Sequence, residues 1–348
     1  MTKRIRFLAA LTMLTALPAA RGQEVDVVTT LPVYAAIATE IAGDRATTAA
    51  ISRGDEDAHF VKPKPSFALM LKKADLFVTT GLDLELWAPV LIDKSGNRSI
   101  RVGQEGHVSA SVGVPLADIP EVADRSGGDV HIYGNPHIFT SPLNAKIIAA
   151  NIAAGLARVD PESSATYERN LAEFERRIDT ALYGERLVEL LGAETLDSLA
   201  REGKLIPFLE EQQYQGKQLI DSLGGWMRTG LAFRGEPIVA YHKNWTYFTD
   251  LFGLEVIDYV EPKPGIPPSA RHVHELIQRI EAENIRVLLA ASYFSSRQIE
   301  SIASRTGCTA VPVPLGPGAE GPKDYFGLID LWVDDLAAAF DRDPEEPK

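Results

Sequence analysis

Apolar residues are distributed along the chain in two patterns, short continuous runs and longer stretches with helical spacing. The short runs end at turn residues, which is typical of buried strands. They predict strands over residues 24–30, 48–51, 76–80, 237–241, 255–259, 287–291 and 310–314. Stretches in which apolar positions recur every three or four residues predict helices over residues 32–42, 65–73, 144–158, 163–191, 246–252, 269–283, 296–306 and 326–340.

These elements alternate in two blocks, one on each side of the long charged helix. Alternating strands and helices indicate an α/β fold in which parallel sheets are covered by helices on both faces. The long helix fits either a connection between two lobes or an ordinary solvated surface helix. The expected divisions are a signal peptide (residues 1–22), an N-terminal lobe (23–160), a linking helix (161–191), a C-terminal lobe (192–340) and a loose tail (341–348).

The signal peptide is predicted from three basic residues, an apolar run over residues 7–17, and small residues at Ala20 and Gly22. This pattern predicts an exported chain whose mature form begins near Gln23. No cysteine lies near that position, so the sequence does not support a bacterial lipoprotein anchor. No later apolar run has the length of a transmembrane helix.

Composition narrows the possible partners and the source of stability. The 48 acidic and 35 basic residues give a net charge of −13, which argues against nucleic acid and anionic membrane surfaces as partners. Cys308 is the single cysteine of the sequence, so an intramolecular disulfide is excluded. We therefore expect the fold to be held by its apolar cores alone.

Three histidines share one sequence context, since each lies in a loop just before a predicted helix. They are His59, His137 and His242, and His242 also directly follows a predicted strand. In parallel α/β sheets such loops lie at the carboxyl edge, where ligands bind. Three neutral imidazoles suit Zn²⁺ better than Mg²⁺ or Ca²⁺. Because binding needs neutral rings, the affinity is expected to fall as the pH drops through about 6.5.

Four motifs surround these histidines in order: Gly54-Asp55-Glu56-Asp57-Ala58-His59-Phe60, Gly134-Asn135-Pro136-His137-Ile138-Phe139, Tyr241-His242-Lys243-Asn244-Trp245 and Glu261-Pro262-Lys263-Pro264-Gly265. Together they resemble the periplasmic metal-binding proteins of zinc and manganese ABC importers, often called the ZnuA/TroA type or cluster A-I. The resemblance spans nearly the whole mature chain. It implies two lobes, each a mostly parallel sheet flanked by helices, joined by one long rigid helix, with a metal between the lobes.

The resemblance also implies a function. His59, His137 and His242 correspond to the metal ligands, and the third is His in zinc-type members and often Glu in manganese-type ones. The implied protein is not an enzyme: it captures a divalent transition metal, Zn²⁺ in the first instance, and delivers it to an ABC importer permease. A monomer in the periplasm follows, and a periplasmic metallochaperone is compatible as a further partner. A manganese-specific member of the same family is the alternative.

The sequence departs from the family pattern in three places. The fourth ligand has no clear counterpart, because residues 311–318 contain no carboxylate; water, Glu320 or a carboxylate from Asp55 to Asp57 could fill the position. The His- and Asp-rich loop of many zinc-binding members is absent. Residues 185–234 form a longer segment than the family needs, with no assigned role.

Two further interpretations concern His131 and catalysis. His131 precedes His137 by six residues and could be a neighbour of a ligand, a ligand at the entrance or a plain loop residue; we favour a non-ligand. An exported zinc hydrolase is a weaker alternative, since three histidines and one open position also hold catalytic zinc, but no His-Glu-x-x-His motif is present. A surface adhesin with the same fold is the third class, because fold alone does not assign function.

Overall fold

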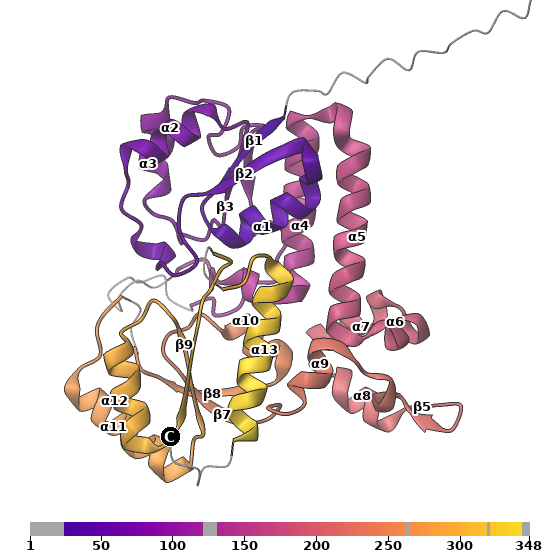
Figure 1. Cartoon of the computed structure of the whole chain (residues 1–348), viewed down its shortest axis with the longest axis vertical. Helices are drawn as coiled ribbons and strands as arrows, with labels where there is room; N and C mark the ends of the chain where they lie inside the picture. The colour runs from indigo at the N-terminus through magenta and orange to yellow at the C-terminus, as the bar shows by residue number, and fades with distance from the viewer. Residues whose placement is uncertain (1–23, 121–130, 262–264, 319–320, 343–348) are drawn as a thin grey trace, which may run out of the picture.

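The computed structural model describes residues 24–120, 131–261, 265–318 and 321–342. The predicted signal peptide, Glu320 and most of the predicted tail lie outside these residues. The chain forms two α/β lobes, one above the other along the long axis, and two long helices run beside the upper lobe (Figure 1). These helices are α4, Pro142–Val159, and α5, Ser164–Tyr183.

The N-terminal lobe contains a parallel sheet with the strand order β2-β1-β3-β4. Its strands are β1 Val25–Thr29, β2 Ala46–Ala50, β3 Leu76–Thr79 and β4 His107–Ser109. Its helices are α1 Pro32–Ala42, α2 Pro65–Lys73 and α3 Ala88–Ser95. Each of these helices has a proline in its first turn, where the missing N–H costs no helical hydrogen bond.

The C-terminal lobe repeats this architecture with a parallel sheet of order β10-β9-β7-β8. Its strands are β7 Pro237–Ala240, β8 Glu255–Tyr259, β9 Val287–Ala291 and β10 Thr309–Val313. Its helices are α10 Thr246–Phe252, α11 Ala270–Glu283, α12 Ser296–Thr306 and α13 Tyr325–Asp341. In both sheets the strand order reverses, at β1 and at β7, and ligands bind beside the carboxyl ends of such strands. The predicted two-lobe α/β fold is confirmed.

The prediction of one continuous helix over residues 163–191 is wrong. Helix α5 ends at Tyr183, and a second helix, α6 Glu185–Leu191, begins after Gly184. Gly184 has a φ of +80°, and a Cβ atom there would lie 2.8 Å from Gly224 Cα. The helix therefore ends where two glycine backbones pack against each other, a contact that a larger residue would prevent.

The segment after α5 contains short elements, and of these the sequence predicts α6 alone, as the end of the long helix. They project beside the lower lobe in Figure 1 and are α6, α7 Ala193–Arg201, α8 Leu205–Glu211, β5 Gln213–Tyr214, β6 Lys217–Gln218 and α9 Gly225–Gly230. Lys146 ties this segment to the long helices, since its Nζ lies 2.6 Å from carboxylate oxygens of both Asp179 and Asp197.

Helix α3 and strand β4 are also absent from the sequence prediction. Short 3-10 helices occur at Gly43–Arg45, Ala58–Phe60, Ile138–Thr140, Pro161–Ser163 and Leu219–Ser222.

The two lobes share one apolar core. A single cluster of buried side chains contains Ile37 of the N-terminal lobe, Phe174 of α5, and Tyr325 and Trp332 of α13. The Tyr325 hydroxyl donates a hydrogen bond to the Phe139 carbonyl at 3.1 Å, which joins α13 to the N-terminal lobe. Any relative movement of the lobes must therefore disturb buried contacts.

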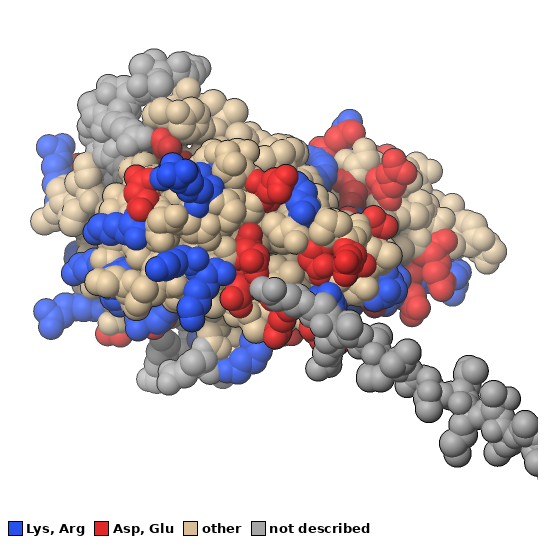
Figure 2. Space-filling model, turned by 90° about the horizontal axis from the view of Figure 1, so that it is seen from above, with Lys and Arg blue, Asp and Glu red and all other residues tan. Residues whose placement is uncertain are grey.

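Charge is unevenly distributed over the surface. In the view from above, Lys and Arg gather at the end of the face near α2 and α3, whereas Asp and Glu are more frequent toward the opposite end (Figure 2). The net charge of −13 therefore does not describe every face. Among the described residues, no helix combines the length and apolarity that crossing a membrane requires.

Candidate metal centre

His59 lies in the short 3-10 helix Ala58–Phe60, in the loop between β2 and α2. Asp57 precedes this turn, and its Oδ1 accepts hydrogen bonds from the backbone N of His59 at 3.0 Å and from its Nδ1 at 2.7 Å. A carboxylate can only accept, so the Nδ1 of a neutral His59 carries the hydrogen and Nε2 keeps a lone pair. Burial raises the pKa of Asp57, but its hydrogen bonds with His59 outweigh this and leave the pKa below its usual value.

His137 is held in the same way from the same lobe. It immediately precedes the 3-10 helix Ile138–Thr140 that leads into α4. Asn135 Oδ1 accepts hydrogen bonds from the backbone N of His137 at 3.0 Å and from its Nδ1 at 2.9 Å. The amide nitrogen of Asn135 donates to the Lys243 carbonyl at 2.8 Å, which fixes the orientation of the amide and ties this loop to the C-terminal lobe. His137 Nε2 is thus left as the lone-pair nitrogen.

His242 comes from the C-terminal lobe, two residues after the end of β7 and ahead of α10. Its Nδ1 has no hydrogen-bond partner among the described residues and lies 3.8 Å from Glu261 Oε1. Glu261 Oε1 also accepts a hydrogen bond from the backbone N of Gly265. The 3.8 Å separation is too long for a hydrogen bond, but an approach of about 1 Å would give His242 the support that Asp57 gives His59.

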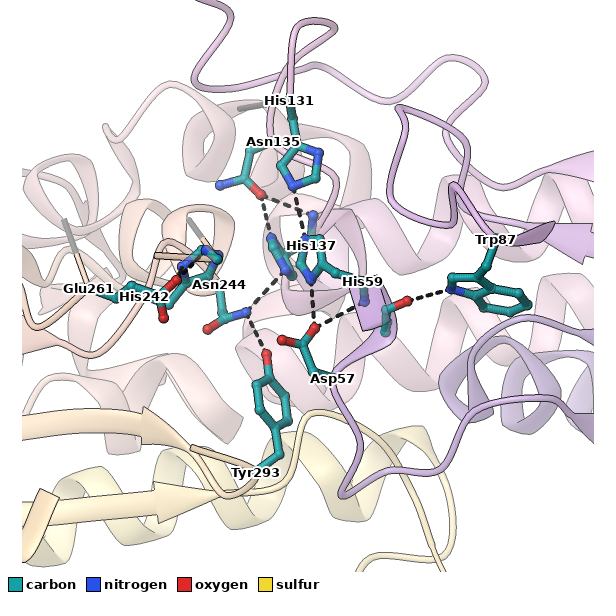
Figure 3. A network of polar contacts seen from close by, with 12 residues as sticks. Asp57, His59, Trp87, His131, Asn135, His137, His242, Asn244, Glu261 and Tyr293 are labelled. Carbon is teal, nitrogen blue, oxygen red and sulfur yellow. Dashed lines mark hydrogen bonds and ion pairs between the residues drawn. The ribbon is translucent and has the colours of Figure 1, made fainter. Parts of the chain in front are cut away.

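The structure brings the three sequence-predicted histidines together. Each offers a ring nitrogen, and these nitrogens all lie within 4.8 Å of one another. Zn–N bonds of about 2.0–2.1 Å in a tetrahedron require nitrogens about 3.4 Å apart, so small adjustments would allow all three to bind one ion. Figure 3 shows the three rings meeting between the lobes, with Asp57, Asn135 and Glu261 behind them.

Burial favours the neutral, ligating form of two of these rings. It lowers the pKa of His137 well below its usual value, and His59, His242 and His131 nearby lower it further. Burial and the neighbouring His59 lower the pKa of His242 to about 3. At neutral pH both rings are therefore uncharged and available to bind a cation.

In His59 and His137 we call Nε2, the nitrogen available to a metal, the front nitrogen, and Nδ1 the rear nitrogen. Two other side chains contact the front nitrogens of these predicted ligands. His131 Nε2 lies 2.9 Å from His59 Nε2. The amide nitrogen of Asn244 lies 3.1 Å from His137 Nε2 and also donates to the Tyr293 hydroxyl at 3.0 Å (Figure 3). Both residues belong to the segments around the histidine motifs, but no spacing in the sequence indicates that they reach the ring nitrogens.

The carboxylates considered from sequence for the fourth ligand have other contacts or lie outside the described residues. Asp55 is exposed and pairs with Arg53 at 3.1 Å. Glu56 Oε2 accepts a hydrogen bond from the backbone N of Arg53 at 3.4 Å, and Asp57 contacts the rear nitrogen of His59. Glu320 lies outside the residues that the structure describes. Glu261 is a carboxylate near the centre that sequence reasoning missed as a site residue, although its motif was recognised.

Two cavities that share lining residues lie beside the centre. The inner cavity is lined by His59, His242 and Phe294, and the outer one by Tyr241, Pro267 and Gln298, among others. Four residues line both cavities: Asp57, Phe60, Glu261 and Gly265. Both cavities are therefore lined by two carboxylates, of which Asp57 contacts His59 and Glu261 faces His242.

Comparison with known proteins gives consistent matches across the chain. The family model described as "Zinc-uptake complex component A periplasmic" (ZnuA) matches residues 27–182 and 209–339. The chain is 26% identical to the iron-binding protein YfeA of Yersinia pestis, over 93% of the chain and 88% of that protein. It is 23% identical to the high-affinity zinc uptake system protein ZnuA of Bacillus subtilis, over 92% and 88% respectively.

A solved structure shares the fold. It is that of a zinc-bound ZnuA deletion mutant, which superposes with a TM-score of 0.67 at 21% identity, covering 92% of the chain and all of the mutant. The family model leaves residues 183–208 unmatched, which include α6 and α7.

Proposed function

Because the chain belongs to the family of the periplasmic zinc-uptake component ZnuA, we propose that it captures Zn²⁺ in the periplasm and delivers it to the permease of an ABC importer. The ligands are His59, His137 and His242. The chain acts as a monomer, exported through the predicted signal peptide at residues 1–22, and a periplasmic metallochaperone is a compatible second partner. We also propose the domain divisions that the sequence analysis predicts.

The observation that carries the proposal is the convergence of three ring nitrogens within 4.8 Å from both lobes. Oxygen atoms contact the rear nitrogens of His59 and His137, and Glu261 stands behind His242. Histidines that bind metals are oriented in this way by an acceptor on the nitrogen that does not bind the ion. The support comes from this shared arrangement more than from the presence of three histidines.

The choice of Zn²⁺ follows from the donor atoms. Three imidazoles form a borderline-soft, nitrogen-rich set, whereas Mn²⁺ prefers carboxylate, carbonyl and water oxygens. The names of the two relatives mention different metals, iron and zinc, so relationship alone does not select the ion. Elemental analysis of protein purified without added metal tests this choice directly. Manganese in place of zinc would favour the manganese-specific alternative.

Transport without catalysis is the form of the function that we propose. A zinc hydrolase needs a general base close to the metal-bound water. The nearby Asp57 and Glu261 contact or face the rear nitrogens of His59 and His242 and are poorly placed for that role. Turnover of ester or peptide substrates by the zinc-loaded protein, abolished in His242→Ala, would contradict this part of the proposal.

Competition titration against a chromophoric zinc chelator tests the ligand set. We expect one Zn²⁺ per chain, and His59→Ala, His137→Ala and His242→Ala should each weaken binding at least about tenfold, since even partners behind a ligand contribute 10–100-fold. His274→Ala is the matched control, because His274 is exposed on α11. Unchanged affinity in His242→Ala would refute the proposed site.

A further inference from the structure

His131, like Asn244, contacts the predicted centre from the side on which a metal would bind, whereas Asp57 and Asn135 contact it from behind. Its Nε2 lies 2.9 Å from His59 Nε2, and the two ring centroids are 5.0 Å apart. Asp57 already occupies the rear nitrogen of His59 at 2.7 Å. His131 therefore contacts the nitrogen of His59 that is available to bind a metal.

We propose that His131 is the fourth ligand, so that four imidazoles hold the ion; this inference rests on the proposed function of His59, His137 and His242. A residue that only orients a ligand contacts the nitrogen that faces away from the metal. His131 contacts the opposite nitrogen. It must therefore either move away when a metal binds His59 or bind the metal itself.

The geometry favours binding over displacement. Two nitrogens on adjacent corners of a zinc tetrahedron lie about 3.4 Å apart. The present separation of the two Nε2 atoms is 2.9 Å, so a shift of about half an ångström converts the contact into one edge of a tetrahedron. The His131 and His137 ring centroids are 6.2 Å apart, similar to the 5.9 Å between His137 and His242. The group of ring nitrogens within 4.8 Å of one another contains His59, His137 and His242 but not His131, so binding also requires the His131 ring to move toward the other two histidines.

The other side chains near the centre are less suitable as the fourth ligand. Asp57 Oδ1 accepts two hydrogen bonds from His59, and Glu261 Oε1 accepts one from Gly265. Asn244 presents its amide nitrogen to His137, and that nitrogen is a donor without a lone pair for a metal. His131 differs from Asn244 because a change of tautomer can give its contacting nitrogen a lone pair, which an amide nitrogen cannot gain.

The change of role requires a tautomer exchange in His131. Since His59 carries its hydrogen on Nδ1, His131 Nε2–H is the donor in the contact between the two rings. When His131 binds the metal, the hydrogen leaves Nε2 and water returns one to Nδ1, so the ring remains neutral. His131 is half-buried, which allows water to reach it.

A fourth imidazole also affects selectivity. Four nitrogen donors favour Zn²⁺ over Mn²⁺ more strongly than three nitrogens and one oxygen do. Loss of His131 should therefore weaken Zn²⁺ binding more than Mn²⁺ binding. The ratio of the two affinities is a readout that a general loss of structure would not produce.

Zinc-edge X-ray absorption and competition titration with Zn²⁺ test the inference on the full chain. The variants are His131→Ala and His131→Gln, and His274→Ala is the control. Gln keeps an N–H donor for His59 but is a poor zinc ligand. Circular dichroism of each variant excludes misfolding, and Mn²⁺ titration gives the selectivity.

The expected result is four imidazoles around zinc in the wild-type protein, and three imidazoles with one oxygen in both His131 variants. The Zn²⁺ affinity of both variants should fall at least about tenfold, in line with the losses seen for weaker metal-site partners. Three imidazoles in the wild-type protein, or wild-type affinity in His131→Gln, would overturn the inference and leave the three-histidine site intact. Failure of the wild-type protein to bind zinc would instead overturn the proposed function.

Discussion

Asp57 is the residue that fixes the orientation of His59, since its Oδ1 accepts from both the backbone and the ring. Replacing it by Ala frees the ring to rotate, and the loss of such a partner lowers metal affinity by about 10–100-fold. Asp57→Asn keeps an acceptor oxygen and should lose less. Competition titration with Zn²⁺ measures both changes.

Asp55→Ala is the matched control for this prediction. Asp55 lies two residues away, is exposed and pairs with Arg53 on the surface. Exposed ion pairs contribute little, so its removal should leave zinc affinity unchanged. Equal affinities for Asp57→Ala and Asp55→Ala would show that the hydrogen bond to His59 Nδ1 has no role in binding.

The pH dependence of stability follows from the two buried rings. Burial lowers the pKa of His137 well below its usual value and that of His242 to about 3. The unfolded chain therefore binds protons near pH 6.5 that the folded chain does not. Without added metal, the free energy of unfolding should decrease as the pH falls from about 6.5 toward 3. Each ring should contribute a loss of about 1.4 kcal/mol for every pH unit by which its pKa in the folded protein lies below its pKa in the unfolded chain.

Urea unfolding of metal-stripped protein at pH 7.5, 6 and 5 checks this decrease. The double variant His137→Asn/His242→Asn removes both titrating rings and should show a flatter dependence. The same pKa shifts revise the binding expectation, because His137 and His242 remain neutral below pH 6.5 and their competition with protons begins at lower pH. Identical pH profiles of unfolding free energy for the wild-type protein and the double variant would contradict the predicted loss of stability.

At the residue scale, the sequence identifies residues whose position depends on local order. His59, His137 and His242 can be predicted as candidate ligands because each lies just before a helix, and that position is visible in the order of residues along the chain. Glu261 and Asn244 are missed because their contacts with His242 and His137 depend on how loops and lobes meet. The same reason explains why His131 reads as a non-ligand in the sequence and lies beside His59 in the structure.

At the scale of elements, Gly184 is the position at which the connecting helix ends. Its φ of +80° and its approach to Gly224 both disfavour a side chain. Gly192 has a similar conformation, with φ of +77°, but an added Cβ there would meet nothing within 4 Å. Gly184→Ala should therefore destabilise the protein by more than the backbone strain of about 1–3 kcal/mol expected for Gly192→Ala.

Urea denaturation of the two variants separates backbone strain from the clash. Subtracting the effect of Gly192→Ala from that of Gly184→Ala isolates the contact with Gly224 Cα at 2.8 Å. Equal destabilisation in both variants would show that the backbone of Gly224 moves aside without cost, and that packing of the two glycines does not define the end of α5.

Sequence patterns predict best those elements that have a clear start signal or a continuous apolar run. The bounds of α1, α10 and β9 agree with the predicted ranges, because these elements have clear start signals or continuous apolar runs. The helices within residues 185–230 have six to nine residues each. Such helices are stabilised by tertiary packing, as by the burial of Leu187 and Leu196, and carry too few turns for a clear period.

At the scale of the whole molecule, the two lobes are held by more than a linker. One apolar cluster extends through both lobes, and α5 contains 20 residues with no Gly or Pro, a length of about 30 Å. Tyr247 of the C-terminal lobe donates a hydrogen bond to the Asn135 carbonyl at 2.7 Å, directly beside the candidate metal centre. A Cβ atom at Gly54 would lie 2.2 Å from the Gly316 carbonyl oxygen, so the loops of the two lobes also meet at close range.

These contacts predict that metal binding does not open or close the lobes as a clamshell. A hinge in α5 would break helical hydrogen bonds, and separation of the lobes would expose the shared core. Small-angle X-ray scattering should therefore give nearly the same radius of gyration for metal-stripped and zinc-loaded protein. Hydrogen exchange should slow on loading in the loops at residues 54–60 and 131–137, because loops belong to the less stable parts of a fold. A clear change in the scattering curve would contradict this prediction, and Gly184, the first residue beyond the uninterrupted helix, would then be the first hinge position to test.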